Sequence, residues 1–207
     1  MLSAVNCFVE GNSNKEENFI MKENSKKIVG LGLLTAIVIV LQALAISIRF
    51  GVFNITLVLV PIIVGAALYG YKAGAWLGGV FGVVVLFTDA GLFLAINIPG
   101  TILTCVLKGV LAGLCAGLVY LALEKKSQLG AVITAGIVAP VVNTGVFLLG
   151  CRLFFYETVK GWTGADNFIG VAVGLVGINF FVELAINLVL AAAIVQIVKI
   201  GKRNANS

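Results

Sequence analysis

Two ionisable side chains, Lys108 and Glu183, lie inside long apolar stretches of this sequence. A charged group in an apolar surrounding is costly, so it usually pairs with an opposite charge or lines a polar cavity. The stretch around Lys108 covers about residues 100–123, and that around Glu183 covers about residues 169–200. As helices, these stretches place Lys108 roughly 12 Å and Glu183 roughly 20 Å from the same membrane surface. The depths allow the side chains to meet, either as a structural ion pair or beside a substrate cavity.

Neutral polar residues accompany the two charges. Asn179, Glu183 and Asn187 recur every four residues and form one polar stripe on an otherwise apolar helix. Asn143 and Thr144 follow a proline in the middle of another stretch, where the proline frees a backbone carbonyl that can line a cavity. Interhelical hydrogen bonds explain each residue singly, whereas their convergence on one half of a bundle favours a binding site.

Two connections between the stretches are candidate lids over that site. Residues 89–99 are apolar apart from Asp89 and Asn97, and residues 156–167 form the longest connection and contain Trp162. Gln42 in the first stretch adds a further polar group. The candidate substrate-binding residues are Asn54, Asp89, Asn97, Lys108, Asn143, Thr144, Trp162, Asn179, Glu183 and Asn187.

The elements that position these residues are predicted to be transmembrane helices. Of the 207 residues, 60% are hydrophobic and only 11% are charged, whereas soluble domains carry about 25% charged residues. Six stretches reach or approach the roughly 20 residues that a spanning helix needs, and none alternates with the period of two that a membrane strand shows. The sequence therefore predicts an all-α integral membrane protein, a bundle of six transmembrane helices over about residues 28–48, 55–70, 73–88, 100–123, 129–155 and 169–200.

The distribution of cations predicts the orientation of this bundle. Lys and Arg concentrate in cytoplasmic segments of membrane proteins. With the N-terminus in the cytoplasm, the outer loops carry only Arg49, Arg152 and Lys160. The inner side then carries ten cations: Lys15, Lys22, Lys26, Lys27, Lys72, Lys125, Lys126, Lys199, Lys202 and Arg203. Both termini are therefore expected in the cytoplasm, and the net charge of +5 reflects membrane orientation rather than a nucleic-acid partner.

The domain organisation follows from the same pattern. Residues 1–25 are polar and expected to be a disordered cytoplasmic segment, in which Met21 is an alternative start. Residues 26–203 form the membrane domain, and residues 204–207 form a cytoplasmic tail.

Small residues recur every four positions in several stretches. This spacing places them on one helix face and allows close approach of another backbone. Packing within the bundle is the favoured explanation in the third and fourth stretches, whereas at Gly32 and Ala36 in the first stretch a partner-protein surface competes evenly with packing. The recurrent glycines are Gly70, Gly74, Gly78 and Gly82, then Gly109, Gly113 and Gly117, and finally Gly170 and Gly174.

Several functional classes are excluded by what the sequence lacks. It has no histidine, which removes the commonest general base and metal ligand. It has no glycine-rich phosphate loop ending in Lys-Ser or Lys-Thr. Its four cysteines, Cys7, Cys105, Cys115 and Cys151, show no metal-ligand spacing. Neither an enzyme, a cofactor nor a metal site is therefore expected.

Over about residues 26–203 the chain resembles the substrate-binding S components of energy-coupling factor (ECF) transporters, in the group that includes riboflavin-type members. The resemblance rests on the stretches LVPIIVGAALYG, GTILTCVLKGVLAGLCAGLVY, APVVNTGVFLLGCRLFF and INFFVELAIN. The first helix of that family carries two alanines four residues apart, and here Gly32 and Ala36 stand at this spacing. They are the candidate partner-coupling residues.

The resemblance implies capture of a water-soluble vitamin outside a bacterial cell membrane. It also implies docking on a transmembrane T subunit driven by two ATPase subunits, with the S component toppling in the bilayer to release its ligand inside. For the ligand, Lys108 favours a carboxylate such as pantothenate, whereas the aromatic outer end favours stacking of a flavin. Two alternatives remain: a free-standing secondary transporter that uses Lys108 and Glu183 as an ion relay, and a membrane scaffold without a ligand.

Overall fold

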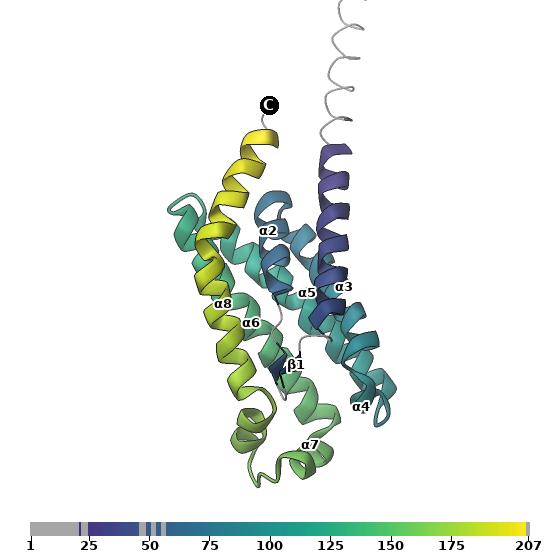
Figure 1. Ribbon diagram of the computed structural model, residues 1–207. Coiled ribbons are helices and arrows are strands. Elements are labelled where there is room, and N and C mark those ends of the chain that lie inside the picture. Colours follow the sequence, from purple (N-terminus) through teal and green to yellow (C-terminus); the bar gives the residue numbers. More distant parts are fainter. Residues whose placement is uncertain (1–20, 22–24, 46–48, 51–52, 55–56, 206–207) are drawn as a thin grey trace, which may run out of the picture.

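The computed structural model describes the backbone of residues 21, 25–45, 49–50, 53–54 and 57–205, and the side chains of these residues other than 49–54, 178–179 and 204–205. The first described helix is Ser25–Ala45, and a short antiparallel hairpin pairs Arg49 with Asn54 and Phe50 with Phe53 (Figure 1). The elements are β1 (Arg49–Phe50), β2 (Phe53–Asn54), α2 (Leu59–Tyr69), α3 (Tyr71–Thr88), α4 (Gly91–Leu94), α5 (Ile98–Leu123), α6 (Gln128–Phe154), α7 (Tyr156–Thr163) and α8 (Phe168–Ala205).

The all-α membrane fold class is confirmed. Within the described residues, five helices are long and apolar enough to cross a membrane: Ser25–Ala45, α3, α5, α6 and the Phe180–Arg203 part of α8. Large apolar side chains point outward from them, with Phe87 87% and Val189 78% exposed, as a lipid-facing surface requires. The predicted span 55–70 corresponds to α2, whose 11 residues extend only about 16 Å. A sixth span is therefore not confirmed.

Helix α2 forms the centre of the bundle instead of a spanning wall. Leu59, Ile62 and Ile63 on it are 2% exposed or less, and they belong to one apolar core with side chains of α3, α5, α6 and α8. Because other helices pack around α2, most of its circumference is apolar. Its sequence is therefore similar to that of a lipid-facing span.

Helices α3 and α5 are antiparallel and pack through glycines. A side chain added at Gly74 or Gly78 would overlap the backbone oxygen of Gly113 or Gly109. The same holds one turn further along, where Gly82 faces the backbone of Cys105. The prediction that these glycines serve internal packing is thus confirmed for Gly74, Gly78, Gly82, Gly109 and Gly113, and we name this contact the glycine seam. Gly70 differs, because its φ of +90° ends α2 and an added Cβ there would meet no atom within 4 Å.

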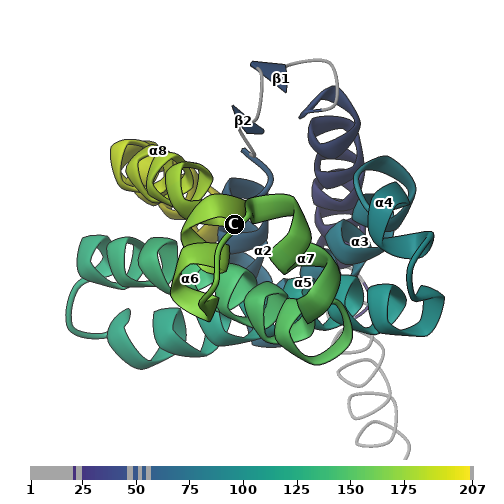
Figure 2. The same cartoon turned by 90° about the horizontal axis from the view of Figure 1, so that it is seen from below.

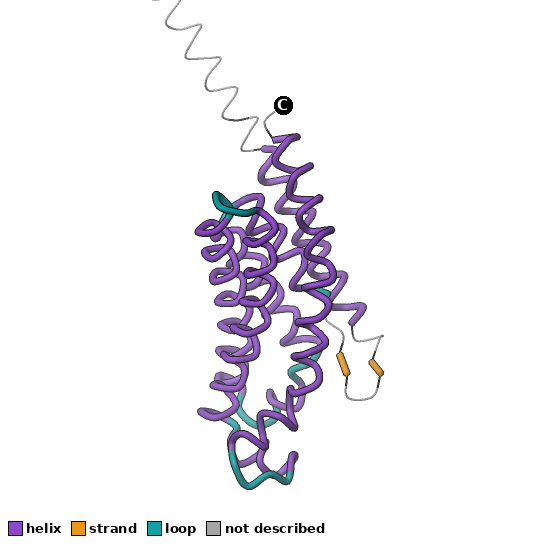
Figure 3. The backbone as a smooth tube through the Cα atoms, turned by 90° about the vertical axis from the view of Figure 1, so that its left-hand side faces the viewer, coloured by secondary structure: helices purple, strands orange, loops and turns teal. Residues whose placement is uncertain are grey.

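The two ends of the bundle differ. The start of the Ser25–Ala45 helix and the end of α8 lie at one end, and α4 and α7 lie at the other. Seen from below, α7 lies across the near end of the bundle (Figure 2), where it contacts α6 and α8. The hairpin of β1 and β2 projects from the side of the bundle (Figure 3). The first described helix therefore begins on the side where α8 ends, while the cytoplasmic location of the termini stays a prediction.

The two connections expected to be lids are partly helical. Residues 89–99 contain α4, and residues 156–167 contain α7. Helix α7 ends at Gly164 in the left-handed conformation, with φ of +63°, a conformation that glycine adopts without strain. The small hairpin likewise differs from the expectation of a strand-free chain, although its strands are two residues long. The predicted disordered segment 1–25 lies outside the described residues, apart from Met21 and Ser25.

Candidate substrate-binding site

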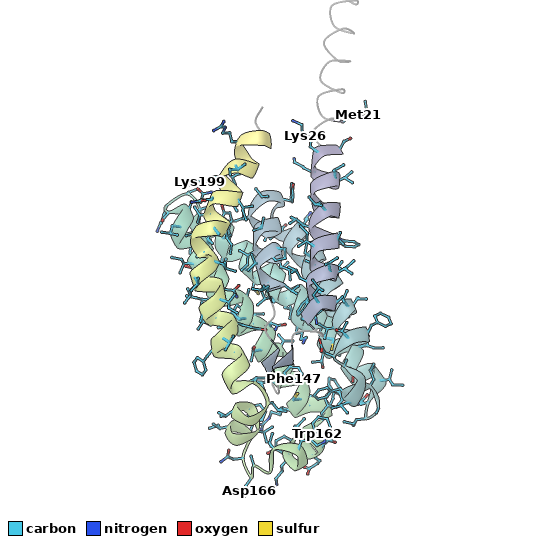
Figure 4. The ribbon with its side chains drawn as sticks, in the orientation of Figure 1. Met21, Lys26, Phe147, Trp162, Asp166 and Lys199 are labelled. Atoms are coloured by element: carbon cyan, nitrogen blue, oxygen red, sulfur yellow. The ribbon has the colours of Figure 1, made fainter. Side chains whose placement is uncertain are left out.

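A cavity of about 240 Å³ lies in the half of the bundle away from the termini. Figure 4 shows Phe147, one of its lining residues, closer to Trp162 than to Lys26 and Lys199. Helices α3, α5, α6 and α8 contribute most of its wall. Among the described residues the lining consists of Gln42, Phe81, Val85, Asp89, Ala90, Phe93, Cys105, Lys108, Asn143, Thr144, Phe147, Leu175, Val176, Phe180 and Glu183.

Helical spacing brings these side chains together. Phe81, Val85 and Asp89 are each four residues apart on α3 and at its C-terminal end, so they share one face. Asn143 and Phe147 stand one turn apart on α6 in the same way. Helix α6 continues through its internal proline, Pro140, which is buried. The parts of the wall that α3 and α6 contribute are therefore stripes along single continuous helices.

Lys108 extends into this cavity between two aromatic rings. Its ammonium lies 5.7 Å from the centroid of Phe81 and 5.2 Å from that of Phe147. A cation over an aromatic face is stabilised by the negative face of the ring, which lowers the cost of a charge inside a bundle of apolar helices. Glu183 lines the same cavity, and the ion pair between Glu183 and Lys108 stays a prediction.

A polar network occupies the end of the cavity near Asp89. Gln42 Nε2 donates to Asp89 Oδ2 at 2.7 Å and to Thr88 Oγ1 at 3.3 Å. The Thr88 hydroxyl donates in turn to Asp89 Oδ2 at 3.1 Å. Gln42 is only 1% exposed, and Thr88 and Asp89 are partly buried, so the network joins the Ser25–Ala45 helix to the end of α3 away from open solvent.

Two buried amide oxygens at the cavity are unsatisfied. Within the described residues, neither Gln42 Oε1 nor Asn143 Oδ1 has a hydrogen-bond partner. Asn143 is 9% exposed. Buried polar atoms are nearly always hydrogen-bonded in folded proteins, so these two oxygens, which belong to residues of the cavity lining, are candidate acceptors for a donor group in the cavity.

Aromatic residues close the end of the cavity near α7. The ring of Phe93 packs edge-on against Phe147, Phe155 and Trp162, with centroid distances of 5.7, 5.1 and 5.4 Å. Phe93 lines the cavity, whereas Trp162 packs behind it and is 47% exposed. The segment after α3 and helix α7 thus meet through one aromatic cluster.

The structure gathers five of the predicted site residues at the cavity: Asp89, Lys108, Asn143, Thr144 and Glu183. The side chains of Asn54 and Asn179 lie outside the described residues.

Three other candidates have different surroundings. The side chain of Asn97 caps α5 by accepting a hydrogen bond from the Gly100 amide at 3.0 Å. Trp162 supports Phe93 from behind. Asn187 is 3% exposed and faces α6, where a Cβ at Gly136 would lie 3.6 Å from that of Asn187.

Sequence reasoning did not select the aromatic part of the wall. Phe81, Phe93, Phe147 and Phe180 line the cavity, yet a phenylalanine in an apolar stretch has no feature that separates it from a core or lipid-facing residue. The spacing of Phe81 to Asp89 and of Asn143 to Phe147 on their helices is the signal that could have identified two of them.

The candidate coupling residues lie on the outer surface of the first helix. Gly32 and Ala36 are exposed, and a Cβ at Gly32 would meet no atom within 4 Å. Their neighbours Val29 and Leu33 are 72% and 64% exposed. This face is therefore available either to lipid or to another protein.

No group of three or more Cys, Asp or Glu side chains that could hold a metal ion occurs in the described part of the chain.

Comparison with known proteins identifies the family. The sequence model of the family described as the ECF transporter substrate-specific component matches residues 26–195. These residues cover most of the chain and the whole lining of the cavity. Comparison with curated proteins and with solved structures gave no significant match. The family consists of transporter subunits rather than enzymes, and it implies a multi-pass membrane location and association with T and ATPase subunits. This chain belongs to the substrate-specific components of ECF transporters.

Proposed function

We propose that this chain captures a vitamin-sized, water-soluble molecule of the riboflavin or pantothenate class for ATP-driven uptake across a bacterial cell membrane. The observation that carries the proposal is the cavity, which places Lys108, Glu183 and Asn143 inside a bundle whose outer surface is apolar. Polar and ionisable groups inside a membrane protein are costly, and they are typical of substrate pathways.

The position of the cavity supports capture from the outside. It lies in the half away from Lys26 and Lys199, and the positive-inside rule assigns the lysine-rich end to the cytoplasm. On this assignment the cavity, α4 and α7 face the outer side of the membrane.

Labelling tests this orientation. In a variant whose native cysteines are replaced by serine, a single cysteine at Asp166, which is exposed beyond α7, should react with a membrane-impermeant thiol reagent on intact cells. A single cysteine at Lys125, exposed at the opposite end between α5 and α6, should react only after the cells are opened. The reverse pattern would contradict the outward-facing site.

Small-molecule analysis tests ligand capture. The purified chain in detergent is denatured, and the released compounds are identified by mass spectrometry. We expect one stoichiometric small molecule, and uptake of that molecule into vesicles only when T and ATPase subunits are reconstituted with the chain. The absence of any released or bound small molecule would overturn the proposal and favour a scaffold.

The first helix is the proposed docking face for the T subunit. Gly32 and Ala36 present small residues to an open surface, which allows close approach of a partner helix. Ala36→Trp should therefore leave ligand binding unchanged and reduce uptake by about tenfold or more, because bulk there separates the helices. Val189→Trp, at a 78% exposed position on α8, is the control and should retain uptake. Full uptake by the Ala36 variant would place the docking face elsewhere.

A secondary transporter is the second candidate function, because Lys108 and Glu183 line one cavity and could exchange a proton. Uptake by the chain alone, driven by an ion gradient and lost in Glu183→Gln, would favour it.

A further inference from the structure

We infer that the ligand is a compact carboxylate that also carries several N–H or O–H donors, with Gln42 and Asn143 as the residues that read the donors and Lys108 as the residue that reads the carboxylate. The inference rests on the proposed function, since it concerns the same cavity. It is carried by the two unsatisfied buried amide oxygens and by the aromatic surroundings of Lys108.

The orientation of the Gln42 amide is determined by its partners. Gln42 Nε2 donates to Asp89 Oδ2 at 2.7 Å, so the NH₂ group of the amide faces Asp89. The carbonyl Oε1 then points elsewhere, and Gln42 lines the cavity. With no partner in the described part of the chain, this oxygen needs a donor. A ligand that presents an N–H or O–H group supplies it.

Asn143 extends the same requirement to a second place in the cavity. It stands on α6, one turn before Phe147, and its Oδ1 is buried with no hydrogen-bond partner among the described residues. Because leaving a buried acceptor unsatisfied is costly, a ligand with donors at two separate positions binds more tightly than one with a single donor.

Lys108 is a donor, whereas the two amide oxygens are acceptors. Within the described residues, its ammonium lies over the rings of Phe81 and Phe147. A ring stabilises the charge but accepts no conventional hydrogen bond from the three N–H donors of a lysine. A ligand carboxylate would accept these donors and neutralise the charge.

The two acids of the cavity are compatible with this assignment. Asp89 already accepts hydrogen bonds from Gln42 and Thr88, and Glu183 is also engaged in an interaction. Phe81, which lies against Lys108, and Asp89 are eight residues apart along α3, or about 12 Å. The ligand carboxylate can thus bind near Lys108 while a donor group at the other end of the ligand faces Gln42, beside Asp89.

The size of the cavity limits the ligand further. Its volume of about 240 Å³ lies below the roughly 300–1,000 Å³ of pockets for drug-sized molecules. A compact, flexible acid is therefore favoured over a three-ring flavin.

Binding titrations with matched probes test the inference. Pantothenate has a carboxylate, an amide N–H and two hydroxyl groups. Panthenol replaces only the carboxylate by an alcohol, and N-(3,3-dimethylbutanoyl)-β-alanine lacks only the hydroxyl groups. The wild-type chain should prefer pantothenate over panthenol by roughly 30-fold or more, and over the dehydroxylated analogue by about 10-fold.

Variants assign each preference to a residue. Lys108→Met should abolish the preference for pantothenate over panthenol. Gln42→Met and Asn143→Leu should each reduce the preference over the dehydroxylated analogue toward unity. A purely structural role would weaken all probes equally and leave the preferences intact. Thr35→Val on the first helix and Thr134→Val on α6 are the controls, since both hydroxyls bond to backbone carbonyls outside the cavity.

The outcomes separate the inference from the proposed function. Tight binding of riboflavin without binding of pantothenate would overturn the inference and leave substrate capture standing. Preferences that persist in the variants would overturn the residue assignments. If no small molecule binds the wild-type chain, the proposed function itself fails.

Discussion

The two faces of helix α3 differ in what they contact. Gly74, Gly78 and Gly82 face α5 so closely that added side chains would overlap its backbone. Phe81, Val85 and Asp89, on a neighbouring face of the same helix, border a cavity. A four-residue repeat therefore serves close packing on one face of α3 and lines the cavity on the other.

The difference shows how a small bundle can hold a cavity. Two helices whose backbones touch cannot slide or separate without losing many contacts. The packing of α3 against α5 therefore fixes the position of Phe81 relative to Lys108. The opposite wall, formed by α6 and α8, contributes amide and carboxylate groups as well as rings. Backbone-close packing thus holds one wall, and the polar groups of α6 and α8 face the same cavity from the other helices.

The largest expected effect breaks the glycine seam. Gly78→Ala places a methyl group on the carbonyl oxygen of Gly109, and α3 must then move away from α5. We expect the free energy of unfolding to fall by about 3 kcal/mol or more, measured by denaturant titration in detergent. Gly145→Ala on α6, where a Cβ would meet nothing within 4 Å, should change it by less than about 1 kcal/mol. Equal stability of the two variants would contradict the seam.

An intermediate effect tests the charges on the other face. If Lys108 and Glu183 interact across the cavity, Lys108→Met and Glu183→Gln should each lower the free energy of unfolding by about 2 kcal/mol. This loss is smaller than that expected for a fully buried ion pair, because both side chains are only partly buried. The double variant should lose less than the sum of the two, because no single charge is left behind. Additivity within about 0.5 kcal/mol would show that the two side chains act independently.

The smallest effect concerns an ion pair at the end of the bundle that holds the termini. Lys202 on α8 pairs with Glu124 at the end of α5, and their side chains are 41% and 23% exposed. Partly exposed pairs contribute at most about 1 kcal/mol, so Glu124→Gln should reduce stability by that much or less and leave ligand affinity unchanged. A large loss of affinity would mean that the two ends are coupled.

The candidate site was partly predictable from the sequence. Lys108, Glu183, Asp89, Asn143 and Thr144 were selectable because polar groups are rare in apolar helices, and all five line the cavity. Asn97 met the same criterion but caps α5, since a polar side chain next to a helix start also satisfies free backbone amides. Local sequence does not distinguish these two uses.

The sequence by itself determined that this is an α-helical membrane protein. So few charges cannot form a water-compatible surface, and the apolar stretches have the length of membrane helices. The family match over residues 26–195 follows from the same sequence. Only the tertiary structure decided that α2 is a short central helix, that Gln42 reaches Asp89 across 47 positions of the chain, and that four phenylalanines line the cavity. These features depend on contacts between distant segments, which the period of a single helix does not encode.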